Sequence, residues 1–281
     1  MSNLIFTRLL NQQLAAPQFN SPMKIVSHMG AVQAQDIRMM RWAVGIRMQK
    51  PSLEKFKIDF NLVKILRLHL LRGTWQMIAN EDYKWMHDLC AVSFIPVVES
   101  WMKSPYYNMS KEELNKVLNI IIALGEEKDS FTKEDLYAAI KEKLCYTATA
   151  RSMYIYCIMA ELNGIVVSGN LDKINSTYSL VSKKIKKQEN ISHEEALIKL
   201  ARKYFQSHSP ATLSDFVWWS GLKTSECKKA INSLKAEIVV EKWKDREFYI
   251  LDTCRTRGLK KLPLCCYLHS MSILLVIRRE I

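Results

Sequence analysis

The sequence lacks any run of about 18 uncharged apolar residues, the length that a membrane-spanning helix needs. Its first residues also lack the basic, apolar and small-residue pattern of a secretory leader. We therefore expect no membrane segment and a cytoplasmic protein. The chain has 281 residues, 48% of them hydrophobic, which is enough for one large buried core or several small ones.

The seven cysteines lack the paired spacing of a zinc site or a redox dithiol. Most stand singly in helical patterns, and Cys265 and Cys266 are adjacent, so they cannot form a Cys-x-x-Cys chelate. Scattered cysteines of this kind fit a reducing compartment. We expect no metal ion and no cofactor.

Acidic residues are few compared with basic ones. Lys and Arg number 41 against 28 Asp and Glu, which gives a net charge of +13. Such an excess is typical of proteins that bind a polyanion, because each cation that neutralises a phosphate releases a condensed counterion. A basic protein without such a partner is the alternative that charge alone leaves open.

Apolar periodicity predicts a mostly α-helical chain with short β-hairpins. Residues 110–124, 130–144 and 147–164 show helical spacing, and the short β-rich segments 165–169 and 177–181 follow them. Three helices followed by a hairpin is the order of a winged helix, a small helix-turn-helix module.

The same order recurs before and after this segment. The C-terminal half gives helices at 192–208, 212–221 and 223–238 and a hairpin at 239–251. The N-terminal part gives helices near 3–15, 21–31 and 36–48, a hairpin within 62–79 and a further helix from about Glu81. We therefore predict tandem winged-helix units at 1–108, 109–185 and 190–251, followed by an atypical tail at 252–281.

The third helices of the later units carry few side chains suited to reading bases. Arg151 lies near the start of one, and Lys228 is one of several lysines on the other. Neither helix has a cluster of Arg, Asn or Gln for base edges. We take Arg151 and Lys228 as candidate phosphate contacts, and solvated charges on an exposed face are the alternative.

Two glutamines stand out in the segment HMGAVQAQD, residues 28–36. In a continuous helix Gln33 and Gln35 would point about 200° apart, whereas side chains two apart in an extended segment share a face. Gly30 permits the preceding helix to end before them. The pair is therefore a candidate site only if the chain leaves the helix near Gly30.

Three further segments belong with HMGAVQAQD: RMMRWAVGIR, LRGTWQMIANEDYKW and ATLSDFVWWSGL. Together these segments resemble the AlkZ-like (YcaQ-type) DNA glycosylases, a family of tandem winged-helix proteins. The resemblance covers about residues 1–251. It implies a catalytic motif of Gln, an apolar residue and then Gln or Asp, here Gln33-Ala34-Gln35. It also implies double-stranded DNA carrying purines alkylated at N7 or N3 as the partner, and in some members the opening of interstrand crosslinks.

Two neutral amides suffice for this chemistry because an N7-alkylated purine already carries positive charge and leaves with little protonation. The enzyme has to hold a water beside C1′ and stabilise an oxocarbenium-like sugar. We expect Gln35 to be the main water-positioning residue and Gln33 its partner. Asp36 is an accessory candidate through its negative charge, and the alternative is that it caps the next helix.

Four further residues are candidate DNA contacts on the strength of the resemblance. Arg38 and Arg41 share one face of the helix after the motif, and Arg72 and Thr74 belong to the segment RGT. A buried arginine that braces a hairpin is the alternative for Arg72.

Histidines and tryptophans near the motif are expected to pack in the core. His28 and His69 have no acidic partner in view along the sequence. The same expectation holds for the tryptophans Trp42, Trp75, Trp218 and Trp219, although one of the first two could stack on a base or wedge into the duplex.

The residues after 251 do not resemble the β-rich C-terminal region of the family, so we expect that region to be missing. A one-base shift from about Leu264 permits codons for LLPSFDEYLISYKERD, which resembles a Pro-Phe-Asp-Glu-Tyr segment of the family. We therefore expect the tail from about residue 252 to be out of frame.

The leading hypothesis is a monomeric, monofunctional DNA glycosylase that acts in the cytoplasm on nucleoid DNA. Two alternatives remain: a non-catalytic winged-helix regulator, and an inactive truncated remnant of the glycosylase. A regulator would dimerise on a palindromic site, whereas a repair enzyme would bind largely through the backbone and shape of the DNA.

Overall fold

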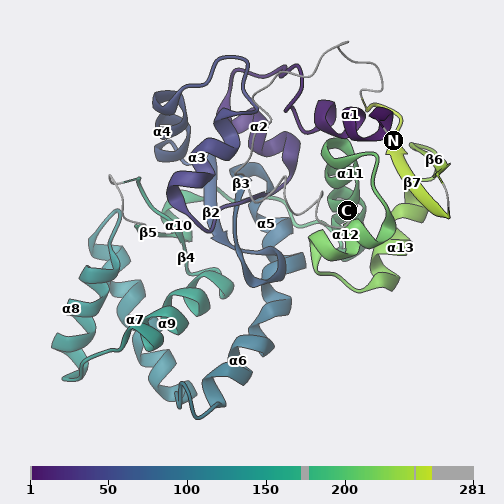
Figure 1. Ribbon diagram of the computed structural model, residues 1–281. Coiled ribbons are helices and arrows are strands. Elements are labelled where there is room, and N and C mark those ends of the chain that lie inside the picture. The colour runs from purple at the N-terminus through teal and green to yellow at the C-terminus, as the bar shows by residue number, and fades with distance from the viewer. Residues whose placement is uncertain (1, 172–176, 244, 255–281) are drawn as a thin grey trace.

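The computed structural model describes residues 2–171, 177–243 and 245–254. The predicted change of reading frame falls almost entirely on residues 255–281, which lie outside the described part. Helices dominate the described residues, whose strands form small antiparallel sheets (Figure 1). Within these ranges, no helix is both long enough and apolar enough to cross a bilayer.

The N-terminal part builds a three-stranded sheet against short helices. Its strands are β1 (Val32–Gln33), β2 (Ile65–His69) and β3 (Trp75–Ala79), in the antiparallel order β1-β3-β2. Its helices are α1 (Ser2–Asn11), α2 (Pro22–Met29), α3 (Ile37–Gly45) and α4 (Leu53–Asn61), and a 3-10 turn η1 (Leu71–Gly73) joins β2 to β3. Every residue of β2 is buried, so the sheet lies inside the molecule.

A kinked helical stretch leads from this sheet to the middle of the chain. It comprises η2 (Asn80–Asp82), α5 (Tyr83–Met86), the π-helical turn η3 (His87–Ala91), η4 (Val92–Phe94) and α6 (Ile95–Lys103). The middle part then contains α7 (Lys111–Glu127), α8 (Lys133–Leu144), α9 (Ala150–Leu162) and the hairpin of β4 (Val166–Ser168) and β5 (Tyr178–Leu180). A capping box of Thr132 and Asp135 starts α8.

The C-terminal part repeats the order of helices and hairpin. After α10 (Val181–Lys184) come α11 (His193–His208), α12 (Leu213–Ser220), α13 (Thr224–Ser233) and the hairpin of β6 (Ile238–Trp243) and β7 (Arg246–Leu251). The central residues of β6 are exposed, and the hairpin lies at the edge of the molecule (Figure 1).

Helix α11 fastens the C-terminal part to the N-terminal part. Nζ of Lys203 on α11 lies 2.6 Å from Oδ2 of the buried Asp82 and donates to Ser27 O in α2 over 3.1 Å. A buried ion pair of this kind fixes relative position more than it adds net stability. One continuous apolar cluster also takes residues from the N-terminal, middle and C-terminal parts.

The predicted helices and the three predicted hairpins are confirmed, with bounds that differ by several residues at some ends. The sequence analysis missed the helices α4 and α10 and the strand β1. A side-chain cap from Ser52 starts α4, and this local signal was overlooked. Strand β1 is only two residues long and exists because it pairs with β3, which is distant in the sequence.

Candidate active site

The segment between α2 and α3 is extended, as the glutamine pair requires. Helix α2 ends immediately before Gly30, whose φ of 75° is a conformation that favours glycine. Gln33 then pairs with Gln76 of β3, and Ala34 N donates to Trp75 O over 2.8 Å. The motif therefore leaves the helix where the sequence predicts, and its two glutamines lie two apart in an extended chain.

Gln33 is half-buried and has an unsatisfied amide atom. Its Oε1 is shielded from solvent, and no donor among the described residues reaches it. Leaving a buried acceptor unpaired costs roughly 1–3 kcal/mol, so such an atom marks a place suited to a water or a substrate group. An amide oxygen accepts two hydrogen bonds, which gives Gln33 the capacity to hold a water.

Gln76 is a third amide beside the pair, and the sequence analysis missed it. It is 4% exposed, and its Nε2 donates to Thr74 Oγ1 over 2.8 Å. Thr74 Oγ1 in turn donates to Leu71 O over 2.9 Å. Residues directly opposite on adjacent strands have neighbouring side chains, so Gln76 borders Gln33. The sequence signal that could have identified Gln76 was its place as a single glutamine within an otherwise apolar strand.

Gln35 is exposed and directly precedes the cap of α3. Asp36 Oδ1 accepts hydrogen bonds from the N–H groups of Arg38 and Met39, over 2.6 Å and 3.0 Å. The hydrogen bonds from Met39 and Arg38 keep the pKa of Asp36 below its usual value. Asp36 therefore caps α3, the alternative that the sequence left open, and it joins the motif rigidly to this helix.

Arg67 braces the backbone of the motif from β2. This buried side chain donates from Nε to Ala34 O over 2.8 Å and from Nη2 to Gln35 O over 3.4 Å. Its guanidinium lies 4.1 Å from the centre of the Trp75 ring. Burial lowers the pKa of Arg67, and the carboxylate of Glu161 opposes that shift. The sequence signal was a single charge inside an apolar strand.

His69 is buried, as expected of a packing residue, but it has an acidic partner that was not in view along the sequence. Its Nδ1 lies 2.5 Å from Glu161 Oε2, and its backbone N donates to the same oxygen over 2.7 Å. Both side chains are almost inaccessible, so the pair ties β2 to α9 rather than facing a substrate. The signal that could have found it was a single carboxylate among the apolar residues at the end of α9.

The predicted phosphate contacts near the motif divide into two groups. Arg38 and Arg41 lie on α3, which follows the motif directly. Arg72 has a φ of 57°, and its guanidinium lies 4.2 Å from the centre of the Trp218 ring on α12. Burial lowers the pKa of Arg72. Arg72 thus reaches toward the C-terminal part, whereas Arg38 and Arg41 stay beside the glutamines.

Arg151 and Lys228 lie on helices other than those that flank the motif. Arg151 is in the first turn of α9, with its guanidinium 3.9 Å from the centre of the Tyr106 ring. Lys228 is exposed on α13. Their predicted role in DNA binding therefore concerns parts of a duplex that flank the one facing the glutamines.

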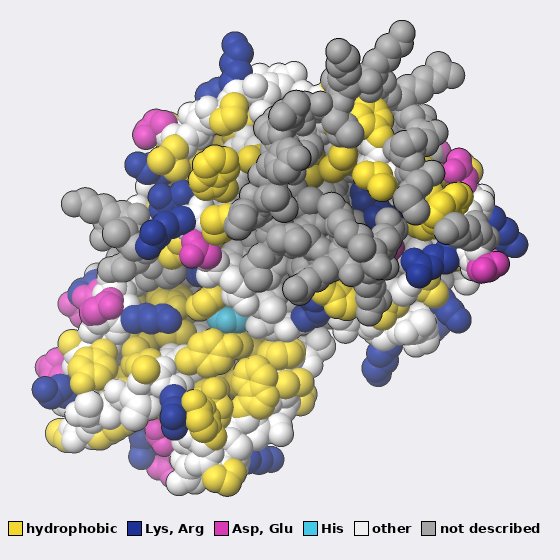
Figure 2. Space-filling model, viewed as in Figure 1, with side chains coloured by type: hydrophobic (Ala, Val, Ile, Leu, Met, Phe, Trp, Pro, Cys, Tyr) yellow, Lys and Arg dark blue, Asp and Glu magenta, His cyan; other side chains and the backbone are white. Residues whose placement is uncertain are grey.

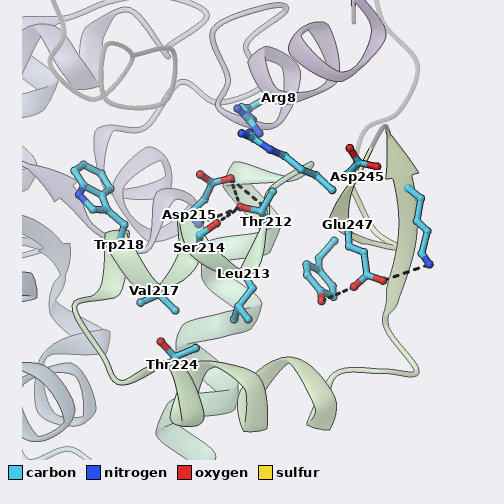
Figure 3. A pocket seen from close by; sticks show the side chains of 13 residues that line it. Arg8, Thr212, Leu213, Ser214, Asp215, Val217, Trp218, Thr224, Asp245 and Glu247 are labelled. Carbon is cyan, nitrogen blue, oxygen red and sulfur yellow. Dashed lines mark hydrogen bonds and ion pairs between the residues drawn. The ribbon is translucent and has the colours of Figure 1, made fainter. Parts of the chain in front are cut away.

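A hollow of about 1080 Å³ lies between α1, α12 and the β6–β7 hairpin, and no motif residue lines it. Figure 3 shows side chains of both charge signs around it, among them Arg8, Asp215 and Glu247. Arg8 donates to Pro210 O over 2.6 Å, and Asp215 accepts from the N–H of Thr212 at the start of α12. With mixed charge and engaged polar groups, this hollow defines no substrate class.

The described fold is similar to that of a solved DNA glycosylase. The structure of Streptomyces sahachiroi DNA glycosylase AlkZ matches with a TM-score of 0.67 and 16% sequence identity, over 89% of this chain and 69% of that chain. At this identity the likeness concerns the fold alone. No curated protein sequence matches this chain significantly.

The sequence itself establishes the family. A family model described as DNA glycosylase AlkZ-like matches residues 26–263, and the chain belongs to this family. The matched range includes the Gln33-Ala34-Gln35 segment and extends beyond residue 251, where the resemblance was expected to end.

Proposed function

We propose that the chain is a monofunctional DNA glycosylase that hydrolyses the N-glycosidic bond of purines alkylated at N7 or N3. The observation that carries the proposal is the extended Gln33-Ala34-Gln35 segment, where a buried, unpaired Oε1 stands two residues from an exposed amide. Membership in the AlkZ-like family supports the same class of reaction.

The reaction needs little help with the leaving group. Alkylation makes the purine cationic, so the C1′–N9 bond breaks with its electron pair moving to the base, which leaves neutral. A water then forms the new bond to C1′ and releases its proton to solvent. Gln35 and Gln33 each accept a hydrogen bond from that water and hold it against the cationic sugar. The products are a free base and an abasic site in an unbroken strand.

Two buried residues position this constellation without touching the substrate. Arg67 holds the carbonyl groups of Ala34 and Gln35, which fixes the direction of the exposed amide. Gln76 is itself oriented by Thr74 and borders Gln33 on the sheet. Such support is needed because small errors in the position of a catalytic group cost large factors in rate.

DNA binding rests on charge spread along the chain. We propose that residues 1–108, 109–185 and 190–251 are winged-helix units, since each has helices followed by an antiparallel hairpin. Arg38 and Arg41 would contact phosphates beside the lesion, and the cations farther away would contact flanking phosphates: Arg72, Arg151 and Lys228, with the Thr74 hydroxyl as a weaker candidate. The same attack on a cationic purine would open an interstrand crosslink joined through N7.

The test is single-turnover release of N7-methylguanine from a methylated duplex, with the full chain in excess. We expect the wild type to release the base and Gln35→Ala to be slower by about 10²–10³-fold. Gln206→Ala, which removes an exposed amide on α11, is the matched control and should keep the wild-type rate. Absence of release by a folded wild type that binds the duplex would refute the glycosylase proposal.

A further inference from the structure

Trp42 on α3 is far more exposed than a tryptophan of the core. Its exposed fraction is 67%, and among the large apolar side chains of the described residues this is the highest value. The expectation that Trp42 packs in the core is therefore wrong. Fully burying an indole ring lowers the free energy by several times RT. An indole that stays in solvent therefore suggests a binding surface when other features nearby also point to a partner.

A second observation is the apolar hollow beside this ring. It has a volume of about 520 Å³, lies between α3, α4 and their connection, and is lined in part by Trp42, Met48, Leu53 and Phe56. Leu53 is itself 50% exposed. The hollow thus continues the apolar surface of the indole from one helix to the next.

The charges around the hollow have one sign. Arg38 and Arg41 are its charged lining residues within the described part of the chain. On an α-helix, residues spaced by three and four share a face, so Arg38, Arg41 and Trp42 project together. Figure 2 shows Lys and Arg side chains next to hydrophobic ones over α3 and α4. This face is therefore complementary to a partner that carries negative charge beside an apolar surface.

The position of this face relative to the glutamines further restricts which kind of partner can bind it. Asp36 caps α3 immediately after Gln35, so the helix leaves the proposed site in a fixed direction. Seven residues separate Gln35 from Trp42, which is roughly 10 Å along a helix that rises 1.5 Å per residue. That length equals about three base steps of DNA. Bases and phosphates of the strand being repaired therefore lie within reach.

We propose that Trp42 stacks on a base of the bound duplex within about three steps of the lesion, while Arg38 and Arg41 contact the phosphates on either side of that base. The proposal rests on the proposed function, because it takes duplex DNA as the partner. Base–aromatic stacking with flanking guanidinium groups is the combination that proteins use where a duplex is locally unstacked.

The test uses the full chain and three duplexes, each with a tetrahydrofuran abasic analogue and a 2-aminopurine one, two or about three steps from it. On these probes no base is released, so binding and base stacking are read without catalysis. We expect the wild type to change the 2-aminopurine fluorescence on binding, and Trp42→Ala to lose that change and bind about tenfold or more weakly. Trp42→Phe, which keeps an aromatic face, should recover most of both signals.

The matched control is Leu62→Ala, which removes a side chain that is 62% exposed and does not line the hollow. Equal affinity and an equal fluorescence change for Trp42→Ala and the wild type would overturn the stacking role. If the wild type binds these probes but releases no N7-methylguanine from methylated DNA, the glycosylase proposal is refuted. The stacking role of Trp42 is then still tested by the fluorescence of the probes. A wild type that binds no DNA overturns both.

Discussion

The two hairpins β2–β3 and β6–β7 differ in how far they are covered, although the end of β7 is buried as well. Every residue of β2 is buried, whereas the central residues of β6 are exposed. The difference comes from what covers them: β1 extends the first hairpin into a sheet, and α9 and β4 pack against its far strand. In the second hairpin α11 and α12 pack against β7, and β6 keeps its central residues in solvent.

The polar residues of the two hairpins therefore have different consequences. In β2, Arg67 and His69 reach the motif backbone and the buried Glu161. In the β6–β7 hairpin, Lys242 and Glu247 face each other over 3.7 Å with most of both side chains in solvent. The buried polar groups of the first hairpin therefore hold neighbouring backbone and side chains in place, whereas the exposed pair of the second stays in contact with solvent.

The largest expected difference concerns stability. Glu161→Ala leaves the buried His69 without its partner and should lower the free energy of unfolding by about 3–5 kcal/mol. Glu247→Ala breaks the exposed pair with Lys242 and should cost less than about 1 kcal/mol. Urea unfolding followed by circular dichroism measures both. If both substitutions lowered the free energy of unfolding equally, the two ion pairs would not differ in their contribution to stability.

The second expected difference concerns the rate of base release. Arg67→Met removes the donors to Ala34 O and Gln35 O and should slow single-turnover release by roughly 10- to 100-fold at saturating enzyme. Arg246→Met, on the exposed hairpin, should leave that rate within about twofold. Both variants are compared only at temperatures where a melting curve shows them folded. A wild-type rate for Arg67→Met would mean that the motif needs no brace.

A third expectation concerns the stability of the protein in acid, through a buried histidine of α11. Burial lowers the pKa of His208 to about 3, assisted by the charges of Arg47 and Arg8. The unfolded chain binds a proton near pH 6.5 and the folded chain does not, so stability falls as the pH drops from about 6.5 toward 3. The slope contributed by this group is about 1.4 kcal/mol per pH unit.

His208→Gln removes that contribution and should flatten the dependence of unfolding free energy on pH below 6.5. Burial also lowers the pKa of His87, which lies against the backbone of Glu161, so His87→Gln is the companion variant beside the first hairpin. An unchanged acid slope in His208→Gln would show that this histidine is protonated in the folded protein.

The smallest expected effect concerns salt. We expect the exposed β6–β7 hairpin to contact the DNA backbone through its cations. Arg246→Ala or Lys242→Ala should then lower the slope of log affinity against log salt by about 1 without changing base release at saturating enzyme. Fluorescence anisotropy with an unmodified duplex measures the slope. If neither variant changes it, the β6–β7 hairpin does not contact the DNA backbone.

Sequence reasoning predicted the elements well because helices and strands carry local signals. The periodicity of α7, α9 and α11, the glycine after α2 and the extended motif could all be read from neighbouring residues. The support of the site could not be read in that way. Arg67 meets Ala34, and His69 meets Glu161, only because distant segments fold together.

The errors have the same origin. Trp42 was assigned to the core because tryptophan is apolar, but exposure depends on whether another element covers α3 at that position. His69 was thought to have no acidic partner because Glu161 lies 92 residues away in the sequence. A single polar residue in an apolar strand or helix is the sequence signal that would have improved the prediction of the site residues and of the residues that support them.

The most direct measurement of the central claim is a double-mutant cycle on the two glutamines in single-turnover release of N7-methylguanine. If Gln33 and Gln35 hold the same water, each alanine variant should lose about 10²-fold or more, and the double variant should be no slower than the slower single variant. Circular dichroism and duplex affinity should be unchanged in all three. Losses that multiply fully, or wild-type rates in either single variant, would contradict a shared water held by the two amides.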